Sequence, residues 1–271
     1  MKILFILLIS TFLLKSDGGY YVVYIQGNPI LKSTHKPLKI GDKISENDGI
    51  IFNNKSEKVS IVSPVKGRFD LFANKAREQH SGELLTVLKS SLLPSVHHYY
   101  LATRSINLLA KDPKIYFNQD DPDLKYLLIN DQPFNVINSY KMDNDNFFFL
   151  QYTLNKKTIL KKIPVSDHAL IFNKHIITDE NNNVVENIDQ ITDCVIAYQY
   201  VNEEAGVNSR VIAKFKPVFV NKGLLGKEIS LLRKNLTVYF KGNKNKINQD
   251  IYDYVNGNYG FIPADDIVNN F

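Results

Sequence analysis

Residues 20–26 read YYVVYIQ, and Gly27-Asn28-Pro29 follows them directly. β-branched and aromatic residues favour a strand, and a Gly-Asn-Pro sequence is typical of the turn that ends one. Apolar runs separated by turn residues continue this pattern at 30–31, 38–44, 50–52, 59–62 and 65–71. Five or six short strands within about fifty residues predict a small β barrel over residues 20–74.

Parts of this block resemble the FecR-like family, the small β domain found in the periplasmic part of iron-transport signalling proteins and in other bacterial envelope proteins. The resemblance is carried by residues 22–27 (VVYIQG), residues 38–44 (LKIGDKI) and the paired runs 50–52 and 59–62. At 53–56 the chain reads NNKS, where the family has an acidic-Gly-Ser hairpin. The family's cytoplasmic helical segment and membrane span are also missing, so the resemblance implies the fold and not anti-sigma signalling.

The N-terminus predicts a secretory signal peptide. Lys2 supplies a positive charge, residues 3–14 are apolar or carry a hydroxyl, and residues 15–19 (KSDGG) are polar and small. The apolar run is shorter than the ~20 residues that a membrane-spanning helix needs. We therefore expect residues 1–16 to be removed, which leaves an exported chain without a membrane span in the periplasm or extracellular space.

Composition and charge exclude several function classes. The chain has 271 residues, with 33 Lys and Arg against 28 Asp and Glu, a formal charge of +5. The excess is small and the cations are mostly lysine, which recognises base edges less well than arginine, so no nucleic-acid partner is expected. Cys194 is the single cysteine, which excludes an intramolecular disulfide and a cysteine-based zinc site.

Two further regions follow the first block. Leucines at three- and four-residue intervals before Pro94 predict a helix over 82–93, inside a helical connector at 75–111. From 112 to 221, alternating apolar runs separated by Asn- and Asp-rich turns predict a second, antiparallel β domain. The expected strands lie at 115–117, 126–129, 134–136, 146–154, 158–164, 169–178, 184–188, 195–201 and 211–220.

The C-terminal segment, 222–271, is predicted to be helical. Apolar residues recur at helical spacing over 224–240 and over 247–255. Residues 259–268 (YGFIPADDIV) resemble the closing strand of SH3-like domains, and we interpret them as a docking tail. The residues predicted to contact a partner are Leu225, Ile229, Leu232, Leu236, Phe261 and Ile262.

The sequence contains no assembled catalytic, cofactor-binding or metal-ligating set. The acidic runs at 120–123, 143–145 and 179–190 resemble calcium loops, but the last has Val184 and Gln190 where the template has Gly and Glu. The histidines at 80, 97 and 98 lack the Gly-rich turn of a serine nucleophile. Cys194 lies among apolar residues, so we expect a buried core residue.

Together these features predict a mainly β protein with α additions that is exported, has no enzymatic activity and binds no cofactor. It would act as an assembly, adaptor or scaffold subunit through contacts with envelope proteins, including subunits of a bacterial secretion machine. A secreted cell-wall or polysaccharide hydrolase is one alternative, and it requires a pocket that gathers His97, Cys194 or carboxylates with perturbed pKa values. A periplasmic peptide- or ligand-binding protein is another, and it requires an apolar groove lined by Tyr and Phe.

Overall fold

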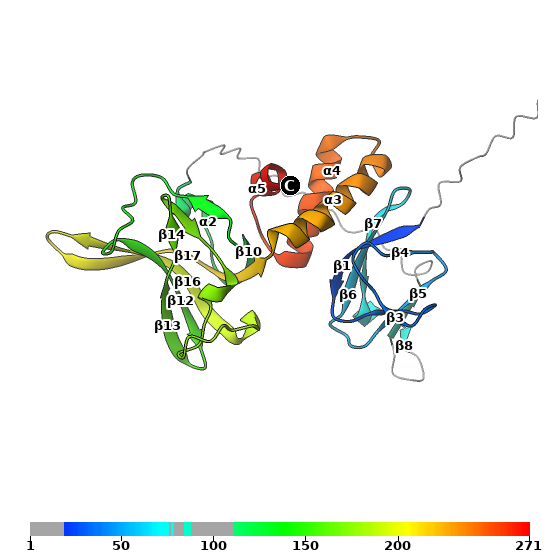
Figure 1. Ribbon diagram of the computed structural model, residues 1–271, viewed down its shortest axis with the longest axis horizontal. Coiled ribbons are helices and arrows are strands. Elements are labelled where there is room, and N and C mark those ends of the chain that lie inside the picture. The colour runs from blue at the N-terminus through cyan, green and yellow to red at the C-terminus, as the bar shows by residue number, and fades with distance from the viewer. Residues whose placement is uncertain (1–18, 76, 79–83, 88–110) are drawn as a thin grey trace, which may run out of the picture. The chain divides into compact units, whose positions relative to one another are not determined.

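The structure is a computed structural model that describes residues 19–75, 77–78, 84–87 and 111–271. The chain forms two compact units, Met1–Ser95 with Asn235–Gly242 and Val96–Lys234 with Asn243–Phe271. Strands dominate and helices are fewer (Figure 1), which confirms the mainly β fold class with α additions. The predicted signal peptide at 1–16, the histidines at 80, 97 and 98, and residues 82–83 and 88–93 of the expected helix lie outside the described residues.

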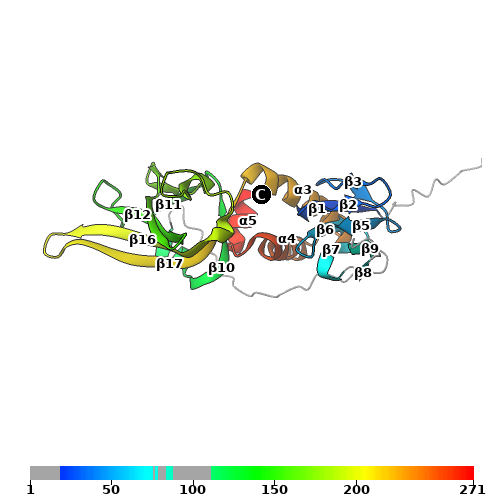
Figure 2. The same cartoon turned by 90° about the horizontal axis from the view of Figure 1, so that it is seen from below.

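The first unit contains two antiparallel sheets (Figures 1 and 2). One sheet has the strand order β4-β1-β6-β7 and the other has the order β3-β2-β5-β9-β8. The strands of the first sheet are Lys43–Ile44 (β4), Tyr20–Gln26 (β1), Lys58–Ser63 (β6) and Gly67–Phe72 (β7). Those of the second are Lys36–Pro37 (β3), Ile30–Leu31 (β2), Gly49–Phe52 (β5), Leu84–Val87 (β9) and Arg77–Glu78 (β8), with a 3-10 turn, η1, at Ala73–Lys75.

Alternate residues of β6 and β7 form the core of the first unit. Val59 lies opposite Leu71 and Ile61 lies opposite Phe69, and all four side chains are buried. Residues directly opposite each other in an antiparallel pair share one face of the sheet, so this face is apolar. The rest of this core consists of Tyr20, Val22, Leu38, Ile44, Ile50, Phe52 and Ala73.

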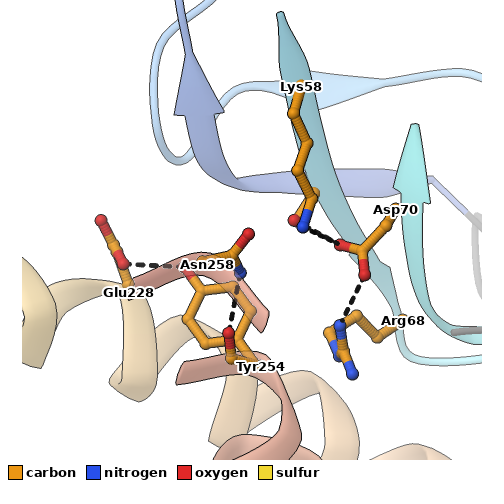
Figure 3. A network of polar contacts seen from close by, with 7 residues as sticks. Lys58, Arg68, Asp70, Glu228, Tyr254 and Asn258 are labelled. Carbon is orange, nitrogen blue, oxygen red and sulfur yellow. Dashed lines mark hydrogen bonds and ion pairs between the residues drawn. The ribbon is translucent and has the colours of Figure 1, made fainter. Parts of the chain in front are cut away.

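The other face of the same two strands carries a polar network (Figure 3). Arg68 Nη1 lies 3.0 Å from Asp70 Oδ2, and Lys58 Nζ lies 3.8 Å from Asp70 Oδ1. The Ser60 hydroxyl donates to the same carboxylate at 2.5 Å. Burial lowers the pKa of Lys58, and the Asp70 charge opposes that shift. Asp70 therefore compensates two buried cations across the β6–β7 pair.

A single carboxylate, Glu57, joins two turns of the first unit. Glu57 is 3% exposed, and its Oε1 accepts from the Asn28 amide at 3.0 Å while its Oε2 accepts from the Asn53 amide at 2.7 Å. The side chain of Asn54 also donates to Oε1, at 3.2 Å. Gly27 has a φ of +87°, and a Cβ there would overlap the Glu57 side chain, so the turn requires glycine.

The structure contradicts part of the helix predicted over 82–93. Residues 84–87 form β9, which pairs with β5 from Gly49–Val87 to Phe52–Leu84. All four residues of β5 are buried, so this strand needs partners on both sides, and that demand outweighs the helical spacing of the leucines. β8 and β9 also extend the first unit into the region predicted to be a helical connector at 75–111.

The second unit is built on a five-stranded sheet with the order β10-β17-β16-β12-β13. Its strands are Asp120–Ile129 (β10), Gly206–Val220 (β17), Ile191–Asn202 (β16), Phe147–Leu154 (β12) and Lys157–Lys162 (β13). Asn155 and Lys156 have positive φ values of 51° and 65°, the conformation of a two-residue hairpin turn. A three-stranded sheet has the order β11-β15-β14, and the remaining elements are Pro133–Asn135 (β11), Ala169–Ile171 (β15), Val165–Ser166 (β14), Lys174–Ile176 (η2) and Ile188–Gln190 (η3).

Several features of the second unit differ from the prediction. The strand expected at 169–178 is a strand only at Ala169–Ile171 and is followed by the 3-10 turn η2. β10 runs parallel to β17, so the sheet is not purely antiparallel. The expected strand at 115–117 is instead helix α2, Pro113–Phe117, because the Asp112 side chain accepts from the Lys114 amide and Pro113 occupies a first-turn position where its missing N–H is not needed. The expected strand at 184–188 is reduced to an isolated bridge between Thr178 and Val184.

Phe117 lies at the centre of an aromatic cluster in the second unit. Its side chain is fully buried, and its ring centroid lies 4.9–5.8 Å from five other ring centroids. Such ring pairs add to the free energy gained by burial. These neighbours come from α2, three strands and a loop: Tyr116, Tyr126, Phe134, Phe172 and Phe215. Phe117 therefore packs α2 against the sheets.

The chain ends in three helices, Lys222–Tyr239 (α3), Lys244–Tyr259 (α4) and Ala264–Asn270 (α5). The first two confirm the helices predicted over 224–240 and 247–255. Asn243 caps α4, because its side chain accepts from the Lys246 amide at 3.2 Å. In the part of the chain that the structure describes, no helix is both long and apolar enough to cross a membrane.

Glu228 of α3 is a buried carboxylate that accepts from two tyrosines, and Figure 3 shows one of them, Tyr254. The Tyr254 hydroxyl donates to Oε2 at 2.7 Å, and the Tyr259 hydroxyl lies 2.8 and 2.7 Å from Oε1 and Oε2. Asn258 Nδ2 donates to the Tyr254 carbonyl at 2.9 Å. Burial raises the pKa of Glu228, and the tyrosine hydroxyls oppose that shift. The cluster links α3 to α4.

Because the pKa of Glu228 is raised, the free energy of unfolding should depend on pH, and Glu228→Gln should remove this contribution. The folded state holds the Glu228 proton more tightly than the unfolded chain, so the stabilisation is present below the ordinary pKa of 4.5 and is lost as pH rises through the folded value. We expect the Gln variant to be at least as stable as the wild type at neutral pH and to lose less stability with rising pH. Urea unfolding from about pH 4 to pH 8 measures this. The exposed Glu180→Gln variant is the control, and equal pH slopes for the wild type and Glu228→Gln would contradict the assignment.

Candidate protein-binding site

The residues predicted to contact a partner pack inside the chain. Leu225, Ile229, Leu232, Leu236 and Ile262 are buried, and Phe261 is half-buried. In this structure they offer little exposed surface, because their apolar faces already contribute to internal packing. Their role in partner binding stays a prediction, and the exposed surface of the second unit lies elsewhere.

Cys194 lies in the core, as the sequence predicted. The residue is 3% exposed and belongs to the buried apolar cluster of the second unit. Burial raises the pKa of the thiol to about 12. The reactive form of a cysteine is the thiolate, which is not formed at neutral pH at such a site. Cys194 therefore acts as a small core residue.

The acidic runs around Asp143 and Asp179 form turns stabilised by amide donors, whereas the run at 120–123 begins strand β10. Asp143 accepts from the backbone and side chain of Asn146, and these hydrogen bonds lower its pKa. Asp179 is held in the same way by Asn183. Within the described ranges, no group of three or more His, Cys, Asp or Glu residues is placed to hold a metal ion. These acids act as solvated turn residues.

The two outer strands of the five-stranded sheet are protected in different ways. Lys157, Lys161 and Lys162 occupy half of β13, and charged residues of this kind discourage a further strand from pairing there. Lys157 pairs with Glu180 at 2.5 Å. β10 is covered from within the chain, because the Phe261 amide donates to the Lys125 carbonyl at 2.7 Å and the Leu127 amide donates to the Phe261 carbonyl at 2.8 Å. The tail predicted to dock therefore caps the edge of β10.

One edge of the sheet has no such protection. β17 pairs with β16 down to the hairpin turn at Asn202–Gly206, but its pairing with β10 begins only at Lys214. Among the described residues, no strand pairs with the other side of 206–213, which we call the open edge. The hairpin extends beyond the neighbouring strands of its unit (Figure 2). On the β16 side, Asn146 Oδ1 accepts from the Val201 amide at 3.1 Å, so that side is capped.

An apolar face lies along the open edge. Val201 lies opposite Val207, and Val211 lies on the same face, four residues further along β17. Their exposed fractions are 46%, 68% and 55%, although valine is usually buried. We call these three residues the valine face. It combines unpaired backbone groups with apolar side chains, the two features that β-strand addition uses.

The opposite face of the hairpin is occupied by its own side chains. The Arg210 guanidinium lies over the rings of Tyr140 and Tyr198, 4.8 and 5.4 Å from their centroids. The rings of Tyr198 and Tyr200 stack at 6.0 Å with an interplanar angle of 13°. These contacts stiffen the root of the hairpin and leave the valine face as the outward side.

A small pocket in the second unit is lined by residues of α2, β10 and β11. It measures about 90 Å³ and is walled by the rings of Tyr116, Phe117, Phe134 and Phe172. At its rim Lys111 Nζ lies 2.5 Å from Asp266 Oδ1, and the Tyr116 hydroxyl donates to Asp266 Oδ2. Gln132 Oε1 also lines it and has no hydrogen-bond partner within the described structure. Burial raises the pKa of the Tyr116 hydroxyl well above its usual value.

Sequence reasoning missed the open edge, because the run at 195–201 and the run at 211–220 were separated by a presumed loop. The sequence did carry a signal, because residues 207–211 read VNSRV, with valines four residues apart on one face of a strand. Gly206, which has a positive φ of 72°, marks the turn before them. Exposure, in contrast, has no signature in the sequence. No protein-family model matches the chain, and no curated protein or solved structure matches it either. The site is therefore defined by its geometry alone.

Proposed function

We propose that this chain is an exported, non-enzymatic envelope protein that acts as an assembly, adaptor or scaffold subunit. In this proposal it binds a strand of a partner protein along the open edge of β17. The single observation that carries the proposal is the open edge beside the valine face, on a sheet whose two outer strands are protected. The signal peptide predicted from the sequence at 1–16 supports export.

Natural sheets rarely leave a long apolar edge exposed, because such an edge also promotes aggregation. In this sheet β13 has three lysines and β10 is covered by residue 261, whereas the open edge has neither protection. This contrast within one sheet favours a functional edge. It fits a subunit that accepts a strand from another protein during assembly.

The FecR-like character of the first unit belongs to the same proposal. Its support is the succession of short antiparallel strands at 20–72, in two sheets around one apolar core. A FecR-like unit would place the chain in the bacterial envelope, where subunits of secretion machines are one class of partner. The SH3-like ending has weaker support, because Phe261 forms only an isolated bridge with Tyr126 before α5.

The pocket walled by aromatic rings favours a second candidate function, the capture of a peptide side chain or small ligand. Its rings match the Tyr- and Phe-lined groove that this alternative requires. Its volume of about 90 Å³ holds no more than one small group, so drug-sized ligands are excluded. The hydrolase alternative gains less support, because the described carboxylate in this pocket, Asp266, is already engaged by Lys111 and Tyr116.

Site-specific cross-linking in the native cells tests the proposal. A photo-reactive amino acid replaces Val207 on the open edge or, as the matched control, Leu160 on the lysine-rich strand β13. The two positions are similarly exposed, at 68% and 58%. We expect Val207 to give one discrete cross-linked product with an envelope protein and Leu160 to give none. The same products from both positions, or none from Val207, would contradict the proposal.

A further inference from the structure

The two ends of the open edge are acidic. Glu203 and Glu204 form the exposed tip of the hairpin, next to residue 206 where the edge begins. At the other end, β10 begins beside Lys214 with the exposed residues Asp120, Asp121 and Asp123. Charges at the rim of an interface select between partners more than they add affinity. The edge therefore carries a charge pattern that a partner must match.

Two of the nearby cations, Lys214 and Arg210, are already engaged. Lys214 Nζ pairs with Asp120 Oδ1 at 2.8 Å, and the Arg210 guanidinium lies over two tyrosine rings on the opposite face. Within the described part of the chain, no ion pair reaches Glu203, Glu204, Asp121 or Asp123. Among the described residues, the tip thus keeps the charges of Glu203 and Glu204, and at the root the two acids Asp121 and Asp123 outnumber the one remaining cation, Lys125. The centre of the edge is apolar through Val207 and Val211.

This pattern argues against a second copy of the chain as the occupant. Antiparallel pairing of residues 206–213 with the same segment of another copy would place residue 206 of one beside residue 213 of the other. Glu203 and Glu204 of each copy would then approach Asp120–Asp123 of the other. Like charges at such short distances disfavour the pairing.

We propose that the open edge binds an extended segment of another protein that has alternating apolar side chains and basic residues at both ends. This inference rests on the proposed function and specifies the partner of the same site. The apolar side chains would contact the valine face, and the basic ends would lie beside Glu203 and Glu204 at the tip and beside Asp121 and Asp123 at the root. Because both ends of the edge are acidic, the charges fit a parallel or an antiparallel strand.

Two labelled peptides test this inference on the full mature chain by fluorescence anisotropy. The first has the sequence KKTVTVTVKK, and the second has glutamate in place of each lysine. We expect the lysine peptide to bind about tenfold more tightly, as the sum of several weak exposed ion pairs, with a preference that shrinks in high salt. Glu203→Lys together with Glu204→Lys should remove most of this preference. Glu180→Lys together with Glu186→Lys, which makes the same charge change away from the edge, should keep it.

Several outcomes would overturn the inference. Equal affinities for the two peptides, tighter binding of the glutamate peptide, or binding of neither at about 1 mM would each contradict it. A concentration-dependent dimer that Val207→Lys dissociates would assign the edge to a second copy. If the Val207 cross-link to an envelope protein persists in cells while the peptides show no charge preference, this inference fails and the proposed function stands.

Discussion

Phe117→Ala is expected to lower the free energy of unfolding of the second unit by about 3–5 kcal/mol. The ring is fully buried and touches five other rings, so its loss removes both the burial of a large apolar side chain and several favourable ring contacts. A cavity would remain, because its neighbours come from separate elements that cannot all move inward. Urea unfolding of the full chain, followed by circular dichroism, measures the change.

Ile115→Ala is the matched control on the same helix. Ile115 is 62% exposed, so its loss should change the free energy of unfolding by no more than about 0.5 kcal/mol. If both variants lost the same free energy, the burial of the Phe117 ring would not account for the loss. The aromatic cluster would then not organise the second unit.

Glu57→Ala is expected to destabilise the first unit by about 2–4 kcal/mol. The carboxylate accepts from the amides of Asn28 and Asn53 and from the side chain of Asn54, and the substitution leaves these donors without their partner. A buried donor that loses its acceptor costs about 1–3 kcal/mol, and part of this cost is relieved because the turns lie near water. Glu57→Gln keeps one acceptor oxygen and should cost about half as much.

An exposed acid of the same unit provides the control. Glu46 pairs with Lys66 at 2.6 Å, but both side chains are more than a third exposed. Glu46→Gln should therefore change the free energy of unfolding by less than about 1 kcal/mol. A comparable loss from Glu46→Gln and Glu57→Gln in thermal unfolding would show that Glu57 acts by its charge and not by its position between the two turns.

The elements that were predicted correctly are those whose sequence pattern matches their own burial. β1 and the strands at 58–63 and 67–72 alternate along one apolar core, and α3 and α4 have apolar residues at helical spacing. In these segments local preference and tertiary packing agree. The secondary structure of a segment can be predicted from sequence when these two factors agree.

Most of the errors occur in segments whose secondary structure is determined by contacts with residues distant in sequence. Leu84–Val87 has the spacing of a helix, but β5 needs a second neighbour and takes it as a strand. The error at 115–117 is an exception, because two local residues, the cap Asp112 and the first-turn Pro113, start a helix in a segment of β-forming residues. The parallel pairing of β10 with β17 joins strands some ninety residues apart, which no local pattern encodes. The candidate site could not be predicted for the same reason. Whether a strand edge is unpaired depends on where the neighbouring strands end, and these strands are distant in sequence.

The predicted contact residues and the open edge differ in exposure. An amphipathic helix has the same sequence pattern whether its apolar face is exposed or packs inside the chain. The sequence alone therefore does not distinguish the two cases. Here Leu225, Ile229, Leu232 and Leu236 are buried, whereas Val201, Val207 and Val211 are exposed. A strand edge binds through its backbone, which leaves little trace in composition.

The most direct test of the central claim is the Val207 cross-link repeated in a Val211→Lys background. This substitution gives the open edge the type of protection that β13 already has, at a position 55% exposed, so folding should be unaffected. We predict that the discrete product disappears, while Leu160→Lys, the same change on β13, leaves it intact. A Val207 product of unchanged yield in the Val211→Lys chain would contradict strand addition at the open edge.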